Sequence, residues 1–336
     1  MHGQNDGHSL SNCYAMEWHV REVYVVYVVV ICTVSTCLSL LVLGLSIKLC
    51  QRKLQALRSY AKIVAFNTCM DIWFIITTVI NFPVAIEYRG LLFLVNENPL
   101  LRALDNFTTN VLMLLYTNTI ILLALCHMVH FWYRYQVFCK TSTWSQTRYL
   151  LTFLGFTLWV AVEYTYACVV TENVAPYYPF LRQIELYNGN VPPFIVFSYA
   201  PVSVVKMAHY QIIITTFYSM VLYFGYKTWR QLHVRHLHIA AQVQNAQRTI
   251  LKTMIMQALY PVIIFLLPIV TALLSIFVDI DFVTAGYILT AAIYFIPILN
   301  SLSVLALIPS YRRMVTCAFL CNRNTHIKVA ASTCLV

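Results

Sequence analysis

The sequence predicts an all-α membrane protein, a seven-transmembrane helix bundle with an extracellular N-terminus. Only 10% of its 336 residues are charged and 60% are hydrophobic, whereas a soluble domain carries about 25% charged residues. Apolar runs of about 20 residues or more, the length that crosses the hydrocarbon core, recur along the chain. A surface this poor in charge needs lipid around most of its area, which excludes a soluble enzyme fold.

Seven apolar runs are long enough to span a bilayer. The stretch before the fifth run, Phe194–Val205, has 12 residues and contains Pro201. We interpret this stretch as part of an extracellular loop, so the start of the fifth helix is the least determined boundary. The predicted spans are Val23–Leu49, Ile63–Ile86, Asn106–Tyr133, Tyr149–Val170, Met207–Tyr226, Ile250–Val278 and Phe282–Leu307.

The charges between the runs predict the orientation. With the N-terminus outside, 17 of the 22 Lys and Arg residues fall in inner segments and ten of the twelve acidic residues fall outside. This positive-inside bias favours an extracellular N-terminus and an odd number of spans. The predicted division is an extracellular segment at residues 1–22, a transmembrane domain at 23–307 and a cytoplasmic helix and tail at 308–336. Glu17 and Glu22 precede a first run long enough to span, so we expect no cleavable signal peptide.

Neither the charge nor the cysteines indicate nucleic acid or metal. The formal charge of +10 is distributed between apolar spans and forms no continuous patch. The eleven cysteines are scattered without zinc-site spacing. His127 and His130 share a helix face but lack a third ligand. We therefore expect no metal, cofactor or nucleic-acid partner. We also expect no enzymatic activity, because no nucleophile and base lie at the same depth in the membrane.

Two carboxylates lie within predicted spans, where charges are costly and often functional. Asp71 lies about 13 Å beyond Lys62 at 1.5 Å per residue, near the middle of the bilayer. A switch role and a polar contact between helices explain Asp71 equally well. For Glu163, nearer the outer surface, we favour the polar contact.

Prolines interrupt the last two predicted spans. Pro261 and Pro268 lie in the sixth, and Pro297 lies in the seventh. A buried proline leaves one carbonyl without its helical donor and permits a kink. These positions predict hinges in helices six and seven.

An amphipathic helix is predicted after the seventh span. It follows Pro309, with Arg312 and Arg313 placed to reach lipid phosphates. Cys317 and Cys321 lie one turn apart and are candidates for palmitoylation, although unmodified thiols fit nearly as well. The apolar positions that recur at helical spacing are Tyr311, Met314, Val315, Ala318 and Phe319.

Three short motifs resemble nematode seven-transmembrane serpentine chemoreceptors, a group of G-protein-coupled receptors, in classes such as Str and Srd. The run His130-Phe131-Trp132-Tyr133-Arg134-Tyr135 is similar to their HF-x-YRY signature. Gln257 followed by Pro261 and Pro268 resembles their QxxxP…P pattern, and Asn300 through Ile308-Pro309-Ser310-Tyr311-Arg312 resembles the end of their seventh helix. The resemblance extends over about residues 20–320, with the motifs on the expected helices.

The resemblance implies a role in G-protein coupling for Tyr133, Arg134 and Tyr135. Tyr133 replaces the usual acidic neighbour of the arginine, so the ionic lock of rhodopsin-like receptors is not expected. The implied switch and hinge residues are Asp71, Gln257, Pro261, Pro268, Pro297 and Asn300, although the NPxxY-like proline after Asn300 is missing.

The outer segments offer few sites for covalent modification. The usual disulfide lacks its cysteines at helix three and in the second outer loop, which leaves Cys13 and Cys168 as the outward candidates. Asn106-Phe107-Thr108 is a glycosylation sequon that lies close to the membrane.

A ligand pocket is predicted in the outer half of the bundle. Asn110, Met113 and Thr117 share one face of helix three, while Tyr287, Thr290 and Tyr294 share one face of helix seven. Apolar walls with a few polar points suit a small, mostly apolar molecule, although packing faces have the same spacing. The expected partners are an odorant or pheromone-like ligand, a heterotrimeric G protein and the plasma membrane of sensory-neuron cilia.

Three other classes of membrane protein make different demands on the sequence. A retinal pump needs a lysine in the last helix, and Phe282–Leu307 contains none. A chemically gated channel or small transporter stays open, although more pore-lining charges or repeats are expected for it. A rhodopsin-like receptor for a peptide or an amine is the third possibility.

Overall fold

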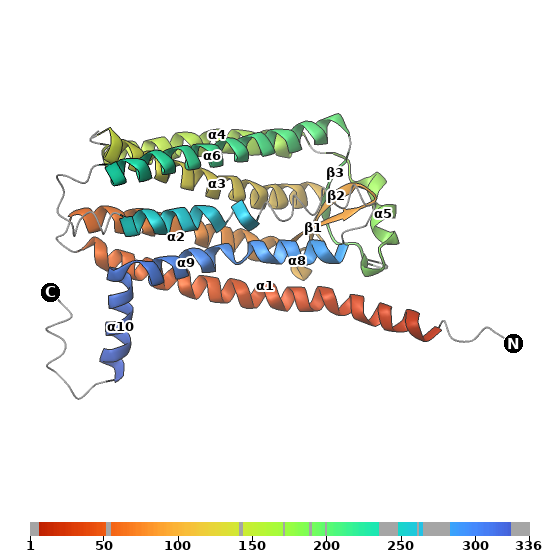
Figure 1. Cartoon of the computed structure of the whole chain (residues 1–336). Helices are drawn as coiled ribbons and strands as arrows, with labels where there is room; N and C mark the ends of the chain where they lie inside the picture. The colour runs from red at the N-terminus through yellow and green to blue at the C-terminus, as the bar shows by residue number, and fades with distance from the viewer. Residues whose placement is uncertain are drawn as a thin grey trace.

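The structure, a computed structural model, is a bundle of long helices with a small β-sheet at one end (Figure 1). The helix α10 begins at the opposite end and points sideways, away from the long helices, so we call the two ends the sheet end and the α10 end. The structure describes residues 7–51, 55–140, 144–170, 172–187, 190–198, 200–234, 248–260, 262–264 and 283–323.

The long helix α3 (Asn106–Cys139) is the centre of the bundle. It contacts α2 (Gln55–Asn81), α4 (Gln146–Val169) and α6 (Pro201–Val234). Its apolar span is 67% buried, compared with 11% for that of α4. Helix α1 (Gly7–Cys50) packs against α2 on the other side. Neighbours therefore surround α3, while α4 turns most of its surface outward.

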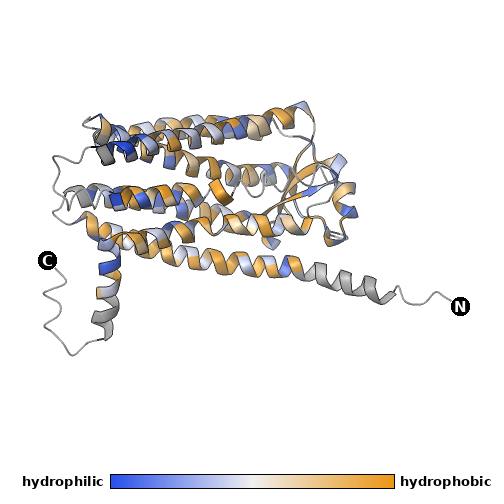
Figure 2. Ribbon diagram, viewed as in Figure 1, coloured by the Kyte–Doolittle hydropathy of each residue, from blue (hydrophilic) through white to orange (hydrophobic). Residues whose placement is uncertain are grey.

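The long helices are rich in apolar residues (Figure 2), and many large apolar side chains are exposed. Leu158 and Val162 on α4 are 61% and 67% exposed, and a soluble monomer rarely shows large apolar patches of this kind. Five helices of the described residues are long and apolar enough to cross a membrane. They are Val20–Cys50, Tyr60–Asn81, Asn106–Val137, Thr147–Val169 and Ala285–Leu307.

A three-stranded antiparallel sheet closes the sheet end, so the prediction of an all-α fold was wrong there. Strands β1 (Pro83–Tyr88) and β2 (Leu91–Asn96) form a hairpin, and β3 (Phe194–Phe197) pairs with β2. Arg89 and Gly90 have φ values of 50° and 72°. Positive φ at both central residues is what a two-residue type I′ turn requires.

The predicted end of the second span and the predicted start of the fifth were wrong. The second span was predicted to reach Ile86, but α2 ends at Asn81 and Pro83 opens β1, because proline supplies no helical N–H donor. The fifth helix was predicted to start at Met207, but α6 starts at Pro201. Proline fits the first turn of a helix, where its missing donor costs nothing; only part of the stretch before Met207 is therefore loop.

The seventh predicted span is broken in two. Helix α8 (Val283–Ile293) ends at a turn formed by Tyr294 and Phe295, and α9 (Ile296–Leu307) follows. Pro297 lies in the first turn of α9, which confirms an interruption at this proline. After Ile308 the chain turns into α10 (Pro309–Arg323), where Tyr311, Met314 and Val315 pack against the core.

The sixth predicted span is described only in part. Residues 248–260 and 262–264 are helical. Pro261, Pro268 and the rest of the predicted span to Val278 lie outside the described residues.

Short helices complete the connection between α4 and β3. They are the helix α5 (Tyr178–Gln183) and the 3₁₀ helices Ala175–Tyr177 and Glu185–Tyr187; a further 3₁₀ helix, Pro99–Leu101, precedes α3. Buried side chains of this connection, Leu181 and Tyr187, join the core beneath the sheet. The sheet end is therefore continuous with the core of the bundle.

We expect Gly286→Ala to destabilise the sheet end. A Cβ at Gly286 on α8 would lie 2.2 Å from the carbonyl oxygen of Ala85 on β1, so one of the two backbones must move. Overpacking of this kind costs about 1–3 kcal/mol. Thermal unfolding of the purified protein measures the loss.

Gly155→Ala is the matched control, because a Cβ at Gly155 on α4 meets no atom within 4 Å. Alanine is a better helix former than glycine by about 1 kcal/mol, so this variant should unfold at the same or a higher temperature. If both variants unfold at the same temperature, the close contact between β1 and α8 is contradicted.

Candidate functional site

A small polar cavity lies in the core between α2, α3 and α9. Its volume is about 20 Å³, which accommodates about one water molecule. The side chains that line it come from α1, α2, α3, α9 and the helical residues 248–260. Its polar lining residues are Tyr60, Asn67, Thr68, Asp71, His127, His130, Gln257, Asn300 and Ser301.

Asp71, Gln257 and Asn300, three of the predicted switch residues, meet at this cavity. Asn300 Nδ2 donates to Asp71 Oδ1 at 2.9 Å, and Gln257 Nε2 donates to the carbonyl oxygen of Asn300 at 3.2 Å. Asp71 is 2% exposed, and a buried carboxylate is strongly destabilising without hydrogen-bond partners. The three residues therefore join α2, α9 and the helical residues 248–260.

A second hydrogen bond joins the helical residues 248–260 to α9. The hydroxyls of Tyr260 and Ser303 lie 2.9 Å apart. Tyr260 follows Gln257 by three residues, and Ser303 follows Asn300 by three residues, so on each helix the two contacts are about one turn apart. This helix is therefore attached to α9 at two successive turns by neutral hydrogen bonds.

Arg134 lies on α3 near the α10 end and is buried at 5% exposure. Its guanidinium carbon lies 5.3 Å from the ring centroid of Tyr60 on α2, a distance typical of cation–π attraction. The tyrosines on either side face other helices: Tyr133 packs edge-on against Tyr149 of α4, and Tyr135 packs on Phe224 of α6. The predicted coupling residues thus contact three different helices.

Three other side chains, two histidines of α3 and one tyrosine of α10, have structural partners. The ring of His130 is stacked on Tyr149 with centroids 5.8 Å apart, and His127 Nδ1 lies 2.8 Å from the carbonyl oxygen of Leu123. Tyr311, the fully buried tyrosine at the start of α10, lies 2.8 Å from the hydroxyl of Ser46 on α1. Sequence reasoning placed Tyr311 on an apolar face but missed this contact.

The predicted ligand-binding face of helix seven contacts the sheet. Thr290 Oγ1 accepts a hydrogen bond from the backbone N–H of Ala85 at 3.1 Å. The hydroxyls of Tyr294 and Tyr24 lie 2.5 and 2.6 Å from the carbonyl oxygen of Pro83. Thr290 and Tyr294 are therefore hydrogen-bonded to β1, whereas the hydroxyl of Tyr287 contacts Glu97 and Tyr187.

The predicted ligand-binding face of helix three has different neighbours. Met113 is fully buried in a small cluster with Ile195 of β3, and Thr117 Oγ1 donates to the carbonyl oxygen of Met113. Asn110 lines a cavity of about 20 Å³ together with Lys206. Within the described residues, no hydrogen bond joins this face to that of helix seven.

A buried ion pair at the sheet end was missed by sequence reasoning. Arg21 donates from Nη2 and Nε to one oxygen of Glu97 at 2.7 and 3.1 Å, and from Nη1 to the carbonyl oxygen of Leu186 at 3.2 Å. Tyr287 donates to the other oxygen of Glu97 at 2.5 Å. Glu97 directly follows the apolar strand β2. A carboxylate next to an apolar run was the feature of the sequence that could have indicated a buried ion pair.

A second carboxylate, Glu172, attaches the loop after α4 to the start of α6. Ser198 and Ser203 donate to it at 2.7 and 2.5 Å, and Tyr177 donates as well. Burial raises the pKa of Glu172, but the three hydroxyl donors more than offset this and leave the pKa below its usual value. The hydrogen bond to Glu172 raises the pKa of Tyr177.

The remaining predicted residues have simpler surroundings. Glu163 on α4 lies 2.9 Å from His209 on α6, a contact between helices of the kind we favoured. Asn106 is exposed at the start of α3, and Cys168 and Cys317 are half-buried. The side chains of Cys13 and Cys321 lie outside the described residues, so the Cys13–Cys168 pair stays a prediction.

Comparisons with known proteins identify the class of this bundle. The fold is similar to that of squid rhodopsin, with a TM-score of 0.55 and 12% sequence identity over 93% of this chain and 87% of that one. The bundle therefore has the fold of a seven-transmembrane receptor. The family described as "Serpentine type 7TM GPCR chemoreceptor Str" matches residues 23–316, and the chain belongs to this family. The predicted resemblance is confirmed, and the family is not a class of enzymes.

Two relatives from Caenorhabditis elegans are similar to parts of the chain. "Serpentine receptor class r-10" is 25% identical over 236 residues, which cover 61% of this chain and 65% of the relative. "G-protein coupled receptor str-33" is 23% identical over 212 residues, which cover 57% of this chain and 61% of the relative. In both cases the similarity covers less than two thirds of the relative's own length.

We expect Glu97→Gln to lower the free energy of unfolding by about 3–5 kcal/mol, because it leaves Arg21 buried without its anion. The double variant Arg21→Met with Glu97→Gln should lose less than the sum of the single variants, because it removes both charges. Chemical or thermal unfolding of the purified protein measures these losses. Glu185→Gln, which changes an exposed carboxylate at the same end, should have little effect. If the loss in the double variant equals the sum of the losses in the Arg21 and Glu97 single variants, the two side chains do not interact.

Proposed function

We propose that this chain is a chemosensory G-protein-coupled receptor of seven spans that binds a small, largely apolar molecule and signals to a heterotrimeric G protein. The proposed division is an extracellular segment at 1–22, the transmembrane domain at 23–307 and a cytoplasmic part at 308–336, in the plasma membrane of sensory cilia. Membership of the Str family supports the receptor assignment. The observation that carries the mechanism is the hydrogen-bonded contact between Asp71, Asn300 and Gln257.

The proposed orientation places the sheet end outside the cell. Lys48 in the last turn of α1, together with Arg312 and Arg313 in α10, gives the α10 end basic charge. Basic residues favour the cytoplasmic side of a membrane. The proposed site of G-protein contact, around Arg134, lies at this same end.

The proposed signal is a movement of the helix that contains residues 248–260. Two neutral hydrogen bonds attach it to α9, and each contributes about 0.5–1.5 kcal/mol. A ligand that favours a second arrangement by a few kcal/mol can therefore shift the population. Displacement of the inner end of this helix would open a cleft beside Arg134, flanked by Tyr133 and Tyr135, with Pro261, Pro268 and Pro297 as the proposed hinges.

The proposed ligand acts at the outer half of the bundle. Tyr287, Thr290 and Tyr294 bind the β1–β2 hairpin and Glu97, so a ligand that moves the hairpin also acts on α8. Asn110, Met113 and Thr117 are the proposed contacts on α3. Modification of Cys317 and Cys321 by palmitate and of Asn106 by glycan is proposed as well.

We expect Arg134→Ala to abolish ligand-dependent signalling while surface expression stays normal. The side chain is buried beside Tyr60, so its proposed role begins only when the helix of residues 248–260 moves. Cyclic AMP and calcium responses to an odorant and metabolite panel, with and without co-expressed Gα subunits, measure the effect. Arg148→Ala is the control because Arg148 is exposed in the first turn of α4. Normal signalling by the Arg134 variant would refute the role.

We expect the double variant Gln257→Met with Tyr260→Phe to raise ligand-independent signalling. It removes both hydrogen bonds between residues 248–260 and α9, worth about 1–3 kcal/mol together, which corresponds to a shift of about 5- to 150-fold in the equilibrium. Thr253→Val is the control, because the Thr253 hydroxyl bonds within its own helix. Unchanged basal activity in the double variant would show that these bonds do not hold the resting state.

A further inference from the structure

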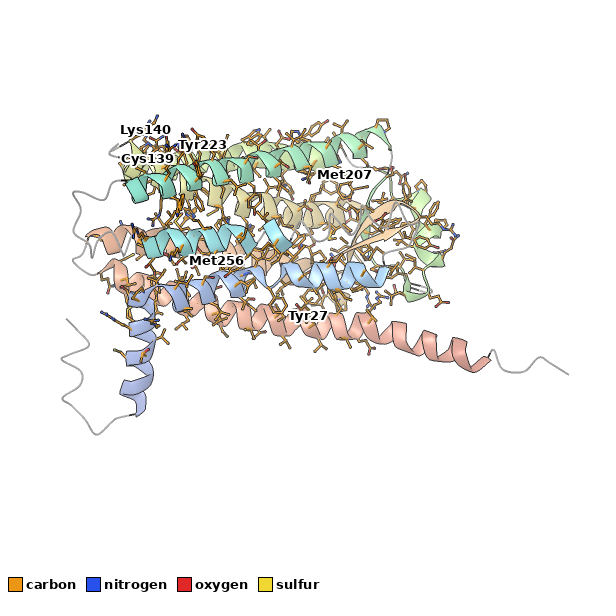
Figure 3. The ribbon with its side chains drawn as sticks, in the orientation of Figure 1. Tyr27, Cys139, Lys140, Met207, Tyr223 and Met256 are labelled. Atoms are coloured by element: carbon orange, nitrogen blue, oxygen red, sulfur yellow. The ribbon has the colours of Figure 1, made fainter. Side chains whose placement is uncertain are left out.

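A cleft of about 370 Å³ opens between α4 and α6 near the sheet end. Met207, labelled in Figure 3, follows Lys206 and marks the level of this cleft on α6. The cleft is far larger than the central polar cavity of about 20 Å³, so it can hold part of a small molecule. It is lined by Glu163, Tyr166, Ala167, Pro201, Val202, Val205, Lys206, His209 and Tyr210.

The rim of the cleft is apolar and faces outward. Tyr166 is 59% exposed, Val202 44% and Val205 66%. The cleft lies within the apolar part of the bundle: Glu163 is about 9 Å and His209 about 12 Å along their helices from the ends at the sheet, at 1.5 Å per residue. In a membrane this opening therefore faces acyl chains of the outer leaflet.

The wall of the cleft is polar, which is costly at a surface that faces lipid. Glu163 Oε2 and His209 Nε2 lie 2.9 Å apart, so these two side chains are each other's polar partners. The hydroxyl of Tyr210 is buried and has no hydrogen-bond partner within the described residues. An unpaired buried hydroxyl costs about 1–3 kcal/mol, and a polar group that enters the cleft recovers this cost when the Tyr210 side chain turns toward it.

Within the described residues, Lys206 forms no ion pair with a carboxylate, although Glu172 lines the same small neighbouring cavity. Lys206 Nζ donates to the carbonyl oxygen of Ala167 at 3.3 Å, and no described carboxylate lies within 4.0 Å. Glu172 lines the neighbouring cavity, where Ser198, Ser203 and Tyr177 already donate to it. The ammonium can form three hydrogen bonds, so it can accept an anionic head group from the cleft.

We propose that this cleft binds an amphiphile with one carboxylate head and an apolar chain, which enters sideways from the outer leaflet. The head group pairs with Lys206 and accepts from the hydroxyl of Tyr210. The apolar chain packs against Val202, Val205 and Tyr166. This site names the ligand class of the proposed receptor function and rests on it.

Lys206 also places the head group beside the central helix. It lines both the cleft and the small cavity that contains Asn110 of α3. A carboxylate that draws Lys206 into the cleft changes the charge next to Asn110 and Glu172. The site is therefore coupled to α3, the helix that bears Arg134 at its other end.

The test measures binding of dodecanoate and of dodecanol to the purified full chain in phosphatidylcholine nanodiscs. We expect Lys206→Met to weaken dodecanoate binding about tenfold or more, the value of one charge-assisted hydrogen bond, and to leave dodecanol unaffected. Lys206→Arg should retain dodecanoate binding. Lys227→Met is the control: this lysine lies on the same helix near the α10 end, over the ring of Tyr223.

A second variant, Val205→Trp, tests the position independently of charge. Its larger side chain at the rim should weaken binding of both probes. Dodecanoate binding that neither variant changes would overturn the proposal. Competition by phosphatidylglycerol as strong as that by dodecanoate would also overturn it, because the site would then bind the head group of an anionic lipid.

Binding in nanodiscs involves no G protein, so the result is independent of the signalling assays. A chain that signals in cells but binds no dodecanoate would refute the cleft proposal and leave the receptor function intact. A chain that binds dodecanoate through Lys206 but signals to no G protein would refute the receptor function and leave binding at the cleft intact. The two proposals can therefore fail separately.

Discussion

The hydrogen bond from Asn300 to the carboxylate of Asp71 is the interaction on which the centre of the structure depends. The hydrocarbon core supplies no water, so a polar group inside the bundle needs a partner from the chain itself. Asp71 is satisfied only while α9 keeps its position beside α2. The carbonyl oxygen of Asn300 in turn accepts from Gln257, so one buried carboxylate determines how three parts of the bundle meet. A ligand that offers its own polar groups can replace hydrogen bonds of this kind.

The same constraint explains the sheet end, where non-helical backbone enters the bundle. The carbonyl oxygen of Pro83 accepts hydrogen bonds from a tyrosine of α1 and from Tyr294 in the turn after α8, and the N–H of Ala85 donates to Thr290. Gly286 allows the backbone of β1 to approach α8 closely enough for these contacts. Arg21 and Glu97 neutralise each other beneath the sheet. The hairpin is therefore a part of the packed core, connected to α1 and α8.

Much of the bundle could be predicted because length and hydropathy determine a transmembrane helix almost alone. Asp71 could be found because a charged residue inside an apolar run is conspicuous, whereas Asn300 was found through the resemblance of its motif to the end of the family's seventh helix. The hairpin could not, because Pro83–Ile86 continues the apolar run of α2 and an apolar strand has the same composition as the end of a span. The partner of Arg21 lies 76 residues away, and such a pairing depends on the fold and not on a local pattern.

These constraints also favour one route for a ligand over another. At the sheet end the polar groups that face β1 are already bound: Tyr294 by Pro83, Thr290 by Ala85 and Tyr287 by Glu97. A ligand that arrives from water must break such bonds before it gains its own. In the cleft between α4 and α6, the hydroxyl of Tyr210 and the ammonium of Lys206 retain unused donors. A carboxylate that enters from the lipid therefore gains hydrogen bonds there without first breaking those that hold the hairpin.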